Sequence, residues 1–248
     1  MIDVHAHLTR ISNIDSIIDE ALSNDVKVII TSTLSINEID RALSLARKFN
    51  GKIYVTLGLE PTNLNLKDIE YIFQILKVRP REVVGIGEVG IDYVKLRDPI
   101  LRELAKTLFT KWLSISKILN MPIIIHSRGA ASSVVKLLIE NQVKNAILHA
   151  FSGSLELVKR CVVEGYYFSI PPSINYSKQK QELVREVPLE QLLLESDTPE
   201  LGPRPGAESR PVHVKLVAEI ISKLKSVALN KVIEVTTENA IKLFNLNV

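Results

Sequence analysis

Six residues that can bind metal follow short apolar runs in this chain, and their positions constrain the fold more than any other feature. They are four of the five histidines and two acids, namely His5, His7, His126, His149, Glu88 and Asp197. Short apolar runs predict strands, and the carboxyl ends of all strands share one rim in a closed parallel barrel. We therefore predict a metal centre at the rim of such a barrel.

Eight apolar runs alternate with longer stretches of helical periodicity, as expected for repeated βα units. The expected strands are Met1–Val4, Val26–Thr31, Ile53–Leu57, Val83–Gly87, Pro122–Ile125, Ala146–His149, Tyr167–Ile170 and Leu192–Ser196. They predict an α/β fold, a (β/α)8 TIM barrel, with residues 1–248 in a single domain. A doubly wound open sheet is the alternative, but it would gather its site at one switch point, whereas polar strand ends run along the whole chain.

The intervening periodic stretches predict helices, some with recognisable caps. The expected helices are Ile14–Ser23, Ile36–Phe49, Ile100–Leu119, Ala131–Asn141, Leu155–Glu164, Val212–Leu224 and Thr236–Phe244. Ser35, Ser154 and Thr236 are expected N-caps, because each offers a side-chain oxygen to free backbone amides. The segment LGPRPGAESRP, residues 201–211, follows the last strand and is expected to form an active-site loop.

Composition narrows the class of protein. Apolar residues make up 46% and charged residues 24% of the 248, so a large core can be buried. A net charge of +3 permits a polyanionic substrate but falls short of a dedicated nucleic-acid binder. The single cysteine, Cys161, excludes an internal disulfide and a thiolate zinc site, and it is expected in the core with Trp112.

The first residues, MIDVHAHL, do not have the basic flank and apolar stretch of a signal peptide. No apolar run approaches the ~20 residues that a membrane span requires. We therefore expect a cytoplasmic protein that does not associate with membranes.

Each of the candidate ligands has a local pattern that suits metal binding. His5 and His7 are spaced i, i+2, so both imidazoles face the same side of an extended segment. Glu88 follows a strand and is flanked by glycines that leave space at the backbone. His126 and His149 end two successive buried runs. Two independent strand-end histidines beside an HxH pair favour ligands over structural histidines.

The last expected strand ends in the acids Glu195 and Asp197, which face the same side. A buried acid is costly unless it is paired or binds metal, so Asp197 is interpreted as a ligand and Glu195 as its supporting partner. The set could hold two divalent ions, with His5, His7 and Asp197 around one and His126 and His149 around the other, Glu88 bridging them. These mixed nitrogen and oxygen donors suit zinc, manganese or iron, and they do not exclude magnesium at a site completed by a substrate phosphate.

A two-ion site lowers the pKa of a bound water and stabilises charge on the attacking and leaving oxygens, so metal-assisted hydrolysis is the expected reaction. Asp197 could accept the proton of the nucleophile.

The motifs MIDVHAHL, VVGIGEVGIDY, MPIIIHSRGA, LHAFSGS, LLLESDTPEL and VTTENAIKLFNL occur in the order and with the spacing of the TatD family of metal-dependent deoxyribonucleases. The chain resembles that family over nearly its whole length. The resemblance implies that His5, His7, Glu88, His126, His149 and Asp197 match the family's metal-ligand positions. It also implies phosphodiester hydrolysis in DNA, with strands trimmed from an end. We infer no obligate protein partner from the sequence.

Two segments depart from the family pattern. The family usually has Gly-x-His-Pro after the third strand, where this chain has Gly58-Leu59-Glu60-Pro61. The family's basic loop after the last ligand is replaced by a segment in which Arg204 and Arg210 carry the positive charge. Arg128, two residues beyond His126, is the best-placed candidate for binding phosphate.

A set of basic residues, Lys95, Arg97, Lys178 and Lys180, could steer a polyanion to the rim or could simply be solvated. Two other functions stay open. A hydrolase with the same metals could act on a small amide, ester or phosphoester, and Glu60 favours this alternative. The chain could also be a weakly catalytic binding protein, although structural metal sites usually need fewer ligands.

Overall fold

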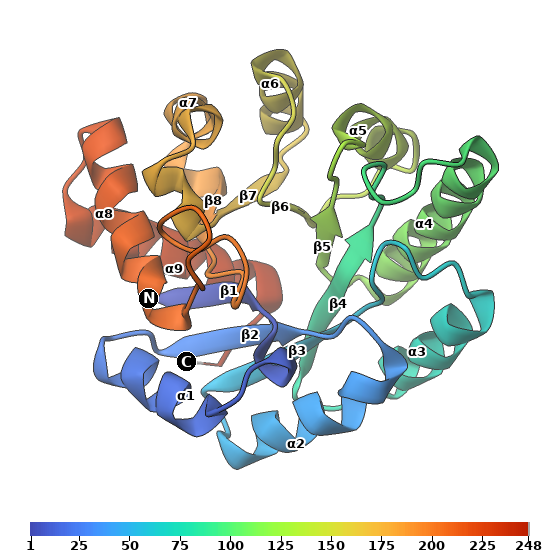
Figure 1. Ribbon diagram of the computed structural model, residues 1–248, viewed down its shortest axis with the longest axis horizontal. Helices are drawn as coiled ribbons and strands as arrows, with labels where there is room; N and C mark the ends of the chain where they lie inside the picture. Colours follow the sequence, from blue (N-terminus) through green and yellow to red (C-terminus); the bar gives the residue numbers. More distant parts are fainter. Residues whose placement is uncertain (248) are drawn as a thin grey trace.

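The computed structural model describes residues 1–247. Its eight strands lie side by side in sequence order, and every neighbouring pair is parallel. Figure 1 shows the strands at the centre of the molecule with helices around them. The strands are β1 (Ile2–Ala6), β2 (Val28–Ser32), β3 (Ile53–Leu57), β4 (Val83–Gly90), β5 (Ile123–His126), β6 (Ala146–His149), β7 (Tyr167–Ile170) and β8 (Leu192–Leu194).

Backbone hydrogen bonds beyond the end of β8 close the barrel. The amide of Asp197 donates to the carbonyl of His5 at 2.9 Å, and the amide of His7 donates to the carbonyl of Thr198 at 2.8 Å. The carboxylate of Asp3 accepts from the amide of Ser196, 193 residues away, at 2.8 Å. The motifs MIDVHAHL and LLLESDTPEL are therefore neighbours, which confirms the predicted (β/α)8 barrel.

A helix follows each strand, and one more ends the described chain. The helices are α1 (Ile14–Ser23), α2 (Ile39–Lys48), α3 (Leu66–Val78), α4 (Pro99–Leu119), α5 (Ala131–Glu140), α6 (Leu155–Val163), α7 (Lys178–Glu186), α8 (Val214–Lys225) and α9 (Leu229–Phe244). Short 3-10 helices lie at Leu8–Arg10, Ile36–Glu38, Pro172–Asn175, Leu189–Gln191 and Pro211–His213. Within residues 1–247, no helix combines the length and apolar character that a bilayer crossing requires.

Most predicted elements agree with the structure to within a few residues, but α3 and α7 were not predicted. Ser154 is confirmed as an N-cap, because its hydroxyl accepts from the amide of Leu157 at 3.3 Å. Ser35 precedes a 3-10 helix and makes no side-chain cap bond. The prediction of Thr236 as an N-cap is wrong: it lies inside α9, and its hydroxyl donates to the carbonyl of Val232 at 2.8 Å.

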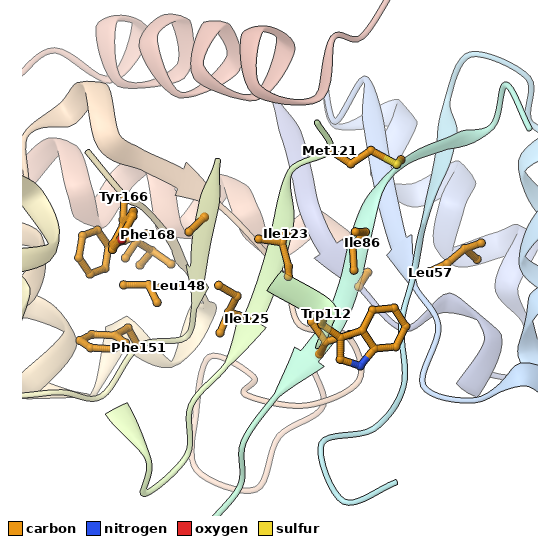
Figure 2. Close-up of a cluster of buried hydrophobic side chains, with 14 of the residues drawn as sticks. Leu57, Ile86, Trp112, Met121, Ile123, Ile125, Leu148, Phe151, Tyr166 and Phe168 are labelled. Atoms are coloured by element: carbon orange, nitrogen blue, oxygen red, sulfur yellow. The ribbon is translucent and has the colours of Figure 1, made fainter. Parts of the chain in front are cut away.

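The core has an outer layer that packs the strands against the helices. Figure 2 shows this layer, in which side chains from the strands, such as Leu57, Ile86 and Leu148, lie with Trp112 from α4. Trp112 and Cys161 are both buried, as predicted.

A second cluster joins side chains from the strands to the C-terminal helix. It contains Ile2, Val4, Val28, Ile30, Val84, Ile124, Ile147, Leu193, Ala240, Phe244 and Leu246. In a strand, residues two apart face the same side. The residues two places beyond Ile124, Ile147 and Leu193 are His126, His149 and Glu195, so an apolar layer underlies the polar side chains of the rim.

Candidate metal centre

The side chains of all six predicted ligands converge at the carboxyl end of the barrel. Three overlapping groups have donor atoms within 4.8 Å of one another: His5, His149 and Asp197; His5, His7 and Glu88; and Glu88, His126 and His149. His126 is partly buried and the other five residues are buried. Strands β1, β4, β5 and β6 and the segment after β8 thus contribute to one cluster.

Glu88 is the centre of this cluster, because its two carboxylate oxygens face different histidines. Oε2 lies 3.2 Å from Nε2 of His7 and 3.5 Å from Nε2 of His5. Oε1 lies 2.7 Å from Nδ1 of His126 and 3.9 Å from Nε2 of His149. A carboxylate that presents one oxygen to each of two histidine pairs has the arrangement of a bridging ligand.

Asp197 completes the side of the cluster nearest β1. Its Oδ1 lies 3.4 Å from Nε2 of His5, 3.6 Å from Nε2 of His7 and 3.9 Å from Nε2 of His149. Donor atoms that share one tetrahedral ion at about 2.1 Å lie roughly 3.4 Å apart. The spacing of this acid and the two histidines therefore fits a shared divalent ion.

One buried atom gives an independent indication that the cluster suits a metal. Nε2 of His5 is buried and has no hydrogen-bond partner among the described residues. A buried polar group without a partner is costly, and a bound cation would satisfy this lone pair. The imidazole and carboxylate donors fit zinc, manganese or iron.

The other ring nitrogens of the histidines are held by neighbouring groups. Nδ1 of His5 lies 2.8 Å from the hydroxyl of Ser32, and Nδ1 of His7 lies 3.2 Å from the carbonyl of the same residue. Nδ1 of His149 lies 2.9 Å from Glu195, which also accepts from the hydroxyl of Ser169 at 2.5 Å. These contacts fix each ring so that Nε2 faces the centre. Glu195 therefore has the supporting position that was predicted for it.

Asp92 supports His126 in the same way, and the sequence interpretation missed it. Its Oδ2 lies 3.2 Å from Nε2 of His126, whose Nδ1 faces Glu88. Its Oδ1 accepts from the amides of Val94 and Lys95 at 2.8 and 2.9 Å. The signal was available, since Asp92 follows Glu88 by four residues just past the end of β4.

Backbone geometry at the strand ends brings these groups together. Gly58 and Gly90 allow close approach, since a Cβ at either would collide with the backbone of Glu88 or His126, respectively. Asp197 and Ala150 have φ values of 52° and 42°, in the left-handed region that favours glycine. Non-glycine residues in this region cluster at functional sites, where the surrounding structure holds them.

The buried carboxylates and imidazoles shift one another's protonation. Burial alone lowers the pKa of His7, but hydrogen bonds with Asp197 and Glu88 outweigh it and raise that pKa to about 9. Burial likewise opposes protonation of His126, while Asp92 and Glu88 raise its pKa to about 9. The histidines in turn hold the pKa of Glu88 well below its usual range, against the effect of burial. For the polypeptide alone, His7 and His126 hold protons that a metal must displace.

Five of the six residues of the cluster, all except the fully buried His5, line a pocket of about 780 Å³, which lies within the usual range for ligand sites. Among the predicted basic residues, Arg128, Lys95 and Lys180 line this pocket. Arg210 instead forms an ion pair with Glu20 at 3.2 Å. Arg97, Lys178 and Arg204 are exposed and lie outside the described pocket wall.

Glu60, which departs from the family pattern, also lines the pocket. Its Oε1 lies 2.5 Å from Nζ of Lys95. Both side chains are partly exposed, at 42% for Glu60 and 53% for Lys95. The acid at this position is therefore neutralised by a lysine that the turn after Asp92 holds in place.

Comparison with known proteins agrees with this geometry. The family model described as "TatD related DNase" matches residues 2–245. The chain is 32% identical to the human protein named deoxyribonuclease TATDN3, over 98% of this chain and 94% of that protein. It is also 32% identical to the metal-dependent hydrolase YabD of Bacillus subtilis, over the full length of both. A solved structure, the TatD homologue YjjV of Escherichia coli, superposes with a TM-score of 0.91 at 26% identity, covering 100% of this chain and 98% of that one.

The raised histidine pKa values predict how the stability of the metal-free protein depends on pH. His7 and His126 have a pKa of about 9 in the folded chain, against the ordinary histidine pKa of 6.5 in an unfolded one. Their contribution to stability is therefore complete below pH 6.5 and is lost as the pH rises through about 9. In chelator, the free energy of unfolding from urea titrations should fall between pH 7 and 9.

Saturating zinc or manganese should abolish this fall, because the metal replaces the protons. A His213→Ala control should keep it, since His213 lies outside the cluster and its ring accepts from the amide of Arg210. A metal-free protein whose stability does not change between pH 7 and 9 would contradict the assignment.

Proposed function

Because this chain belongs to the TatD family of metal-dependent hydrolases, we propose that it hydrolyses phosphodiester bonds in DNA. The observation that supports this most directly is the cluster of four histidines and two acids at the floor of a pocket with basic residues on its wall. The similar human protein is named a deoxyribonuclease. Metal-dependent hydrolysis follows from membership of the family, and the choice of DNA as the substrate is what we propose.

The proposed metal ligands are His5, His7, Glu88, His126, His149 and Asp197. Two divalent ions, magnesium, manganese or zinc, would be held on either side of Glu88, with His5, His7 and Asp197 around one and His126 and His149 around the other. When bound, such ions acidify a water molecule and withdraw charge from phosphate oxygens. Every other role in the reaction falls to the protein's own side chains.

We assign the proton transfer to Asp197 and the central positioning to Glu88. Asp197 is buried and its pKa is lowered against the effect of burial, mainly by the charge of His149 and by the adjacent imidazoles of His5 and His7. It is therefore ionised and available to accept a proton from attacking water. Arg128 lines the pocket and makes no ion pair among the described residues, so its guanidinium is free to bind a phosphate oxygen.

The pocket favours recognition of the phosphate backbone over recognition of bases. Its wall, as far as the structure describes it, contains no phenylalanine, tyrosine or tryptophan on which bases could stack. A site without stacking or base-edge readout has weak sequence preference. The pocket's limited volume supports entry of a strand end, and we propose exonuclease action.

The alternative substrate, a small amide, ester or phosphoester, is favoured by one observation, the carboxylate of Glu60 on the pocket wall. An unpaired acid there would repel a polyanion. The ion pair with Lys95 neutralises the carboxylate of Glu60, so DNA remains the better-supported substrate.

Cleavage of end-labelled single-stranded DNA tests the proposal. The wild-type protein, stripped with chelator and reloaded with manganese or magnesium, should shorten the strand from one end. The His126→Ala, His149→Ala double variant should lose this activity, since it removes both histidines that face Oε1 of Glu88. His213→Ala is the matched control and should stay active. A folded, metal-loaded wild type that cuts small esters but no DNA would establish the alternative.

Glu60 generates a separate prediction. Glu60→Gln should lower the KM for an oligonucleotide by up to about fivefold with kcat unchanged, because it releases the ammonium of Lys95 and an exposed ion pair is worth roughly 0–1 kcal/mol. The effect should shrink at high salt.

The same substitution in a Lys95→Met background should also lower KM, since Glu60 is then an unpaired acid that repels the polyanion. If Glu60→Gln instead raises KM in both backgrounds, Glu60 contacts the substrate directly, and the ion-pair explanation is wrong.

A further inference from the structure

Lys180 is the basic residue of the pocket wall that is most withdrawn from water. It lies in the first turn of α7, which follows β7, and it is partly buried, whereas Arg10, Lys95 and Arg128 are exposed. Its Nζ donates to the carbonyl of Ala150 at 3.3 Å. The ammonium therefore points across the top of β6, toward the chain segment that carries His149.

The hydrogen-bonding capacity of this ammonium is largely unused. A lysine ammonium has three donors, and the carbonyl of Ala150 takes one of them. Among residues 1–247, Lys180 forms no ion pair, in contrast to Lys95, which is neutralised by Glu60. Burial lowers the pKa of Lys180, while the charges of Glu195 and Asp197 partly offset that effect. A partly buried cation with free donors in a pocket has the properties of an anion-binding group.

The backbone of Ala150 fixes the position of this ammonium relative to the metal centre. The amide of Ala150 donates to Glu195 at 3.1 Å, and the same carboxylate holds Nδ1 of His149 at 2.9 Å. The carbonyl of Ala150 faces Lys180. Ala150 thus contacts both Glu195, which supports the candidate ligand His149, and Lys180. These contacts hold the ammonium of Lys180 next to the cluster but not within it.

We infer that Lys180 binds a phosphate of the substrate next to the phosphate that is hydrolysed. The inference rests on the proposed function, and it names the substrate class more closely: a nucleic-acid strand with at least two phosphates, one over the cluster and one at Lys180. The reacting phosphate must lie over the six ligands, and Lys180 is offset from them by the Ala150 turn. Its role is to bind and position the strand, with no step in the chemistry.

The neighbouring Lys178 provides a matched control on the same helix turn. It is exposed and lies outside the described pocket wall. A general effect of lowering the positive charge of the protein would appear equally at both lysines. An effect at Lys180 alone would come from its position.

The test compares Lys180→Met, Lys180→Arg and Lys178→Met on two substrates, a single-stranded oligonucleotide and bis(p-nitrophenyl) phosphate. The second substrate has one phosphodiester and no neighbouring phosphate. Lys180→Met should raise the KM for the oligonucleotide by about 10- to 100-fold, the range for loss of a charged hydrogen bond. Its kcat, and all constants for bis(p-nitrophenyl) phosphate, should stay within about twofold, and Lys180→Arg should restore part of the affinity.

A binding measurement provides a readout that does not depend on turnover. Fluorescence anisotropy of a labelled oligonucleotide in chelator should show weaker binding to Lys180→Met than to Lys178→Met, at equal thermal stability. Equal losses on both substrates, or equal binding by the two variants, would overturn the inference while leaving the proposed function intact. A wild type that cleaves bis(p-nitrophenyl) phosphate and leaves DNA intact would overturn both.

Discussion

The carboxylate of Glu88, buried between two pairs of histidines, is the contact around which the top of this barrel is organised. It presents Oε2 to His5 and His7 and Oε1 to His126 and His149. A buried charge is tolerated only where partners compensate it. The surrounding histidines do so, and they are in turn oriented by Ser32, Asp92 and Glu195. The apolar layer below keeps the arrangement out of bulk water, where the same charges would be screened.

The charges of the pocket wall are arranged unequally around this centre. On one side Lys95 is paired with Glu60, so that wall is close to neutral. On another, Lys180 has no carboxylate partner among the described residues and is held by the turn at Ala150. Under the proposed function, a polyanion entering the pocket would be drawn to Lys180 and Arg128, which have no ion-pair partner among the described residues, rather than to Lys95. This asymmetry is a means of orienting a strand, and it does not require contacts with bases.

The strand pattern could be read from the sequence because the buried strands are short continuous apolar runs, and the ligand set because its polar residues follow those runs. An apolar residue inside the barrel, such as Ile124 or Ile147, predicts that the residue two places on also faces inward. The helix α7 was missed because it has only two buried apolar residues, Leu183 and Val184, whereas α3 has a regular apolar stripe at Ile69, Ile72 and Leu76 that was overlooked. Thr236 was taken for a cap because α9 extends further toward the N-terminus than its clearest periodicity indicates.

The supporting groups were harder to predict, because tertiary structure alone gives them a partner. Asp92 resembles an ordinary turn-forming acid until the fold brings His126 within 3.2 Å of it. Likewise, Lys178 and Lys180 are equivalent in a linear sequence, and only the docking of α7 turns one toward the pocket and the other to solvent.

The proposed function depends above all on two divalent ions that would share Glu88. Anomalous diffraction at the manganese edge, from crystals grown with manganese, locates them directly. We predict two peaks, one contacted by His5 and His7 and the other by His126 and His149, with Glu88 within bonding distance of both. A single peak that Glu88 does not contact, or manganese bound elsewhere, would contradict the account.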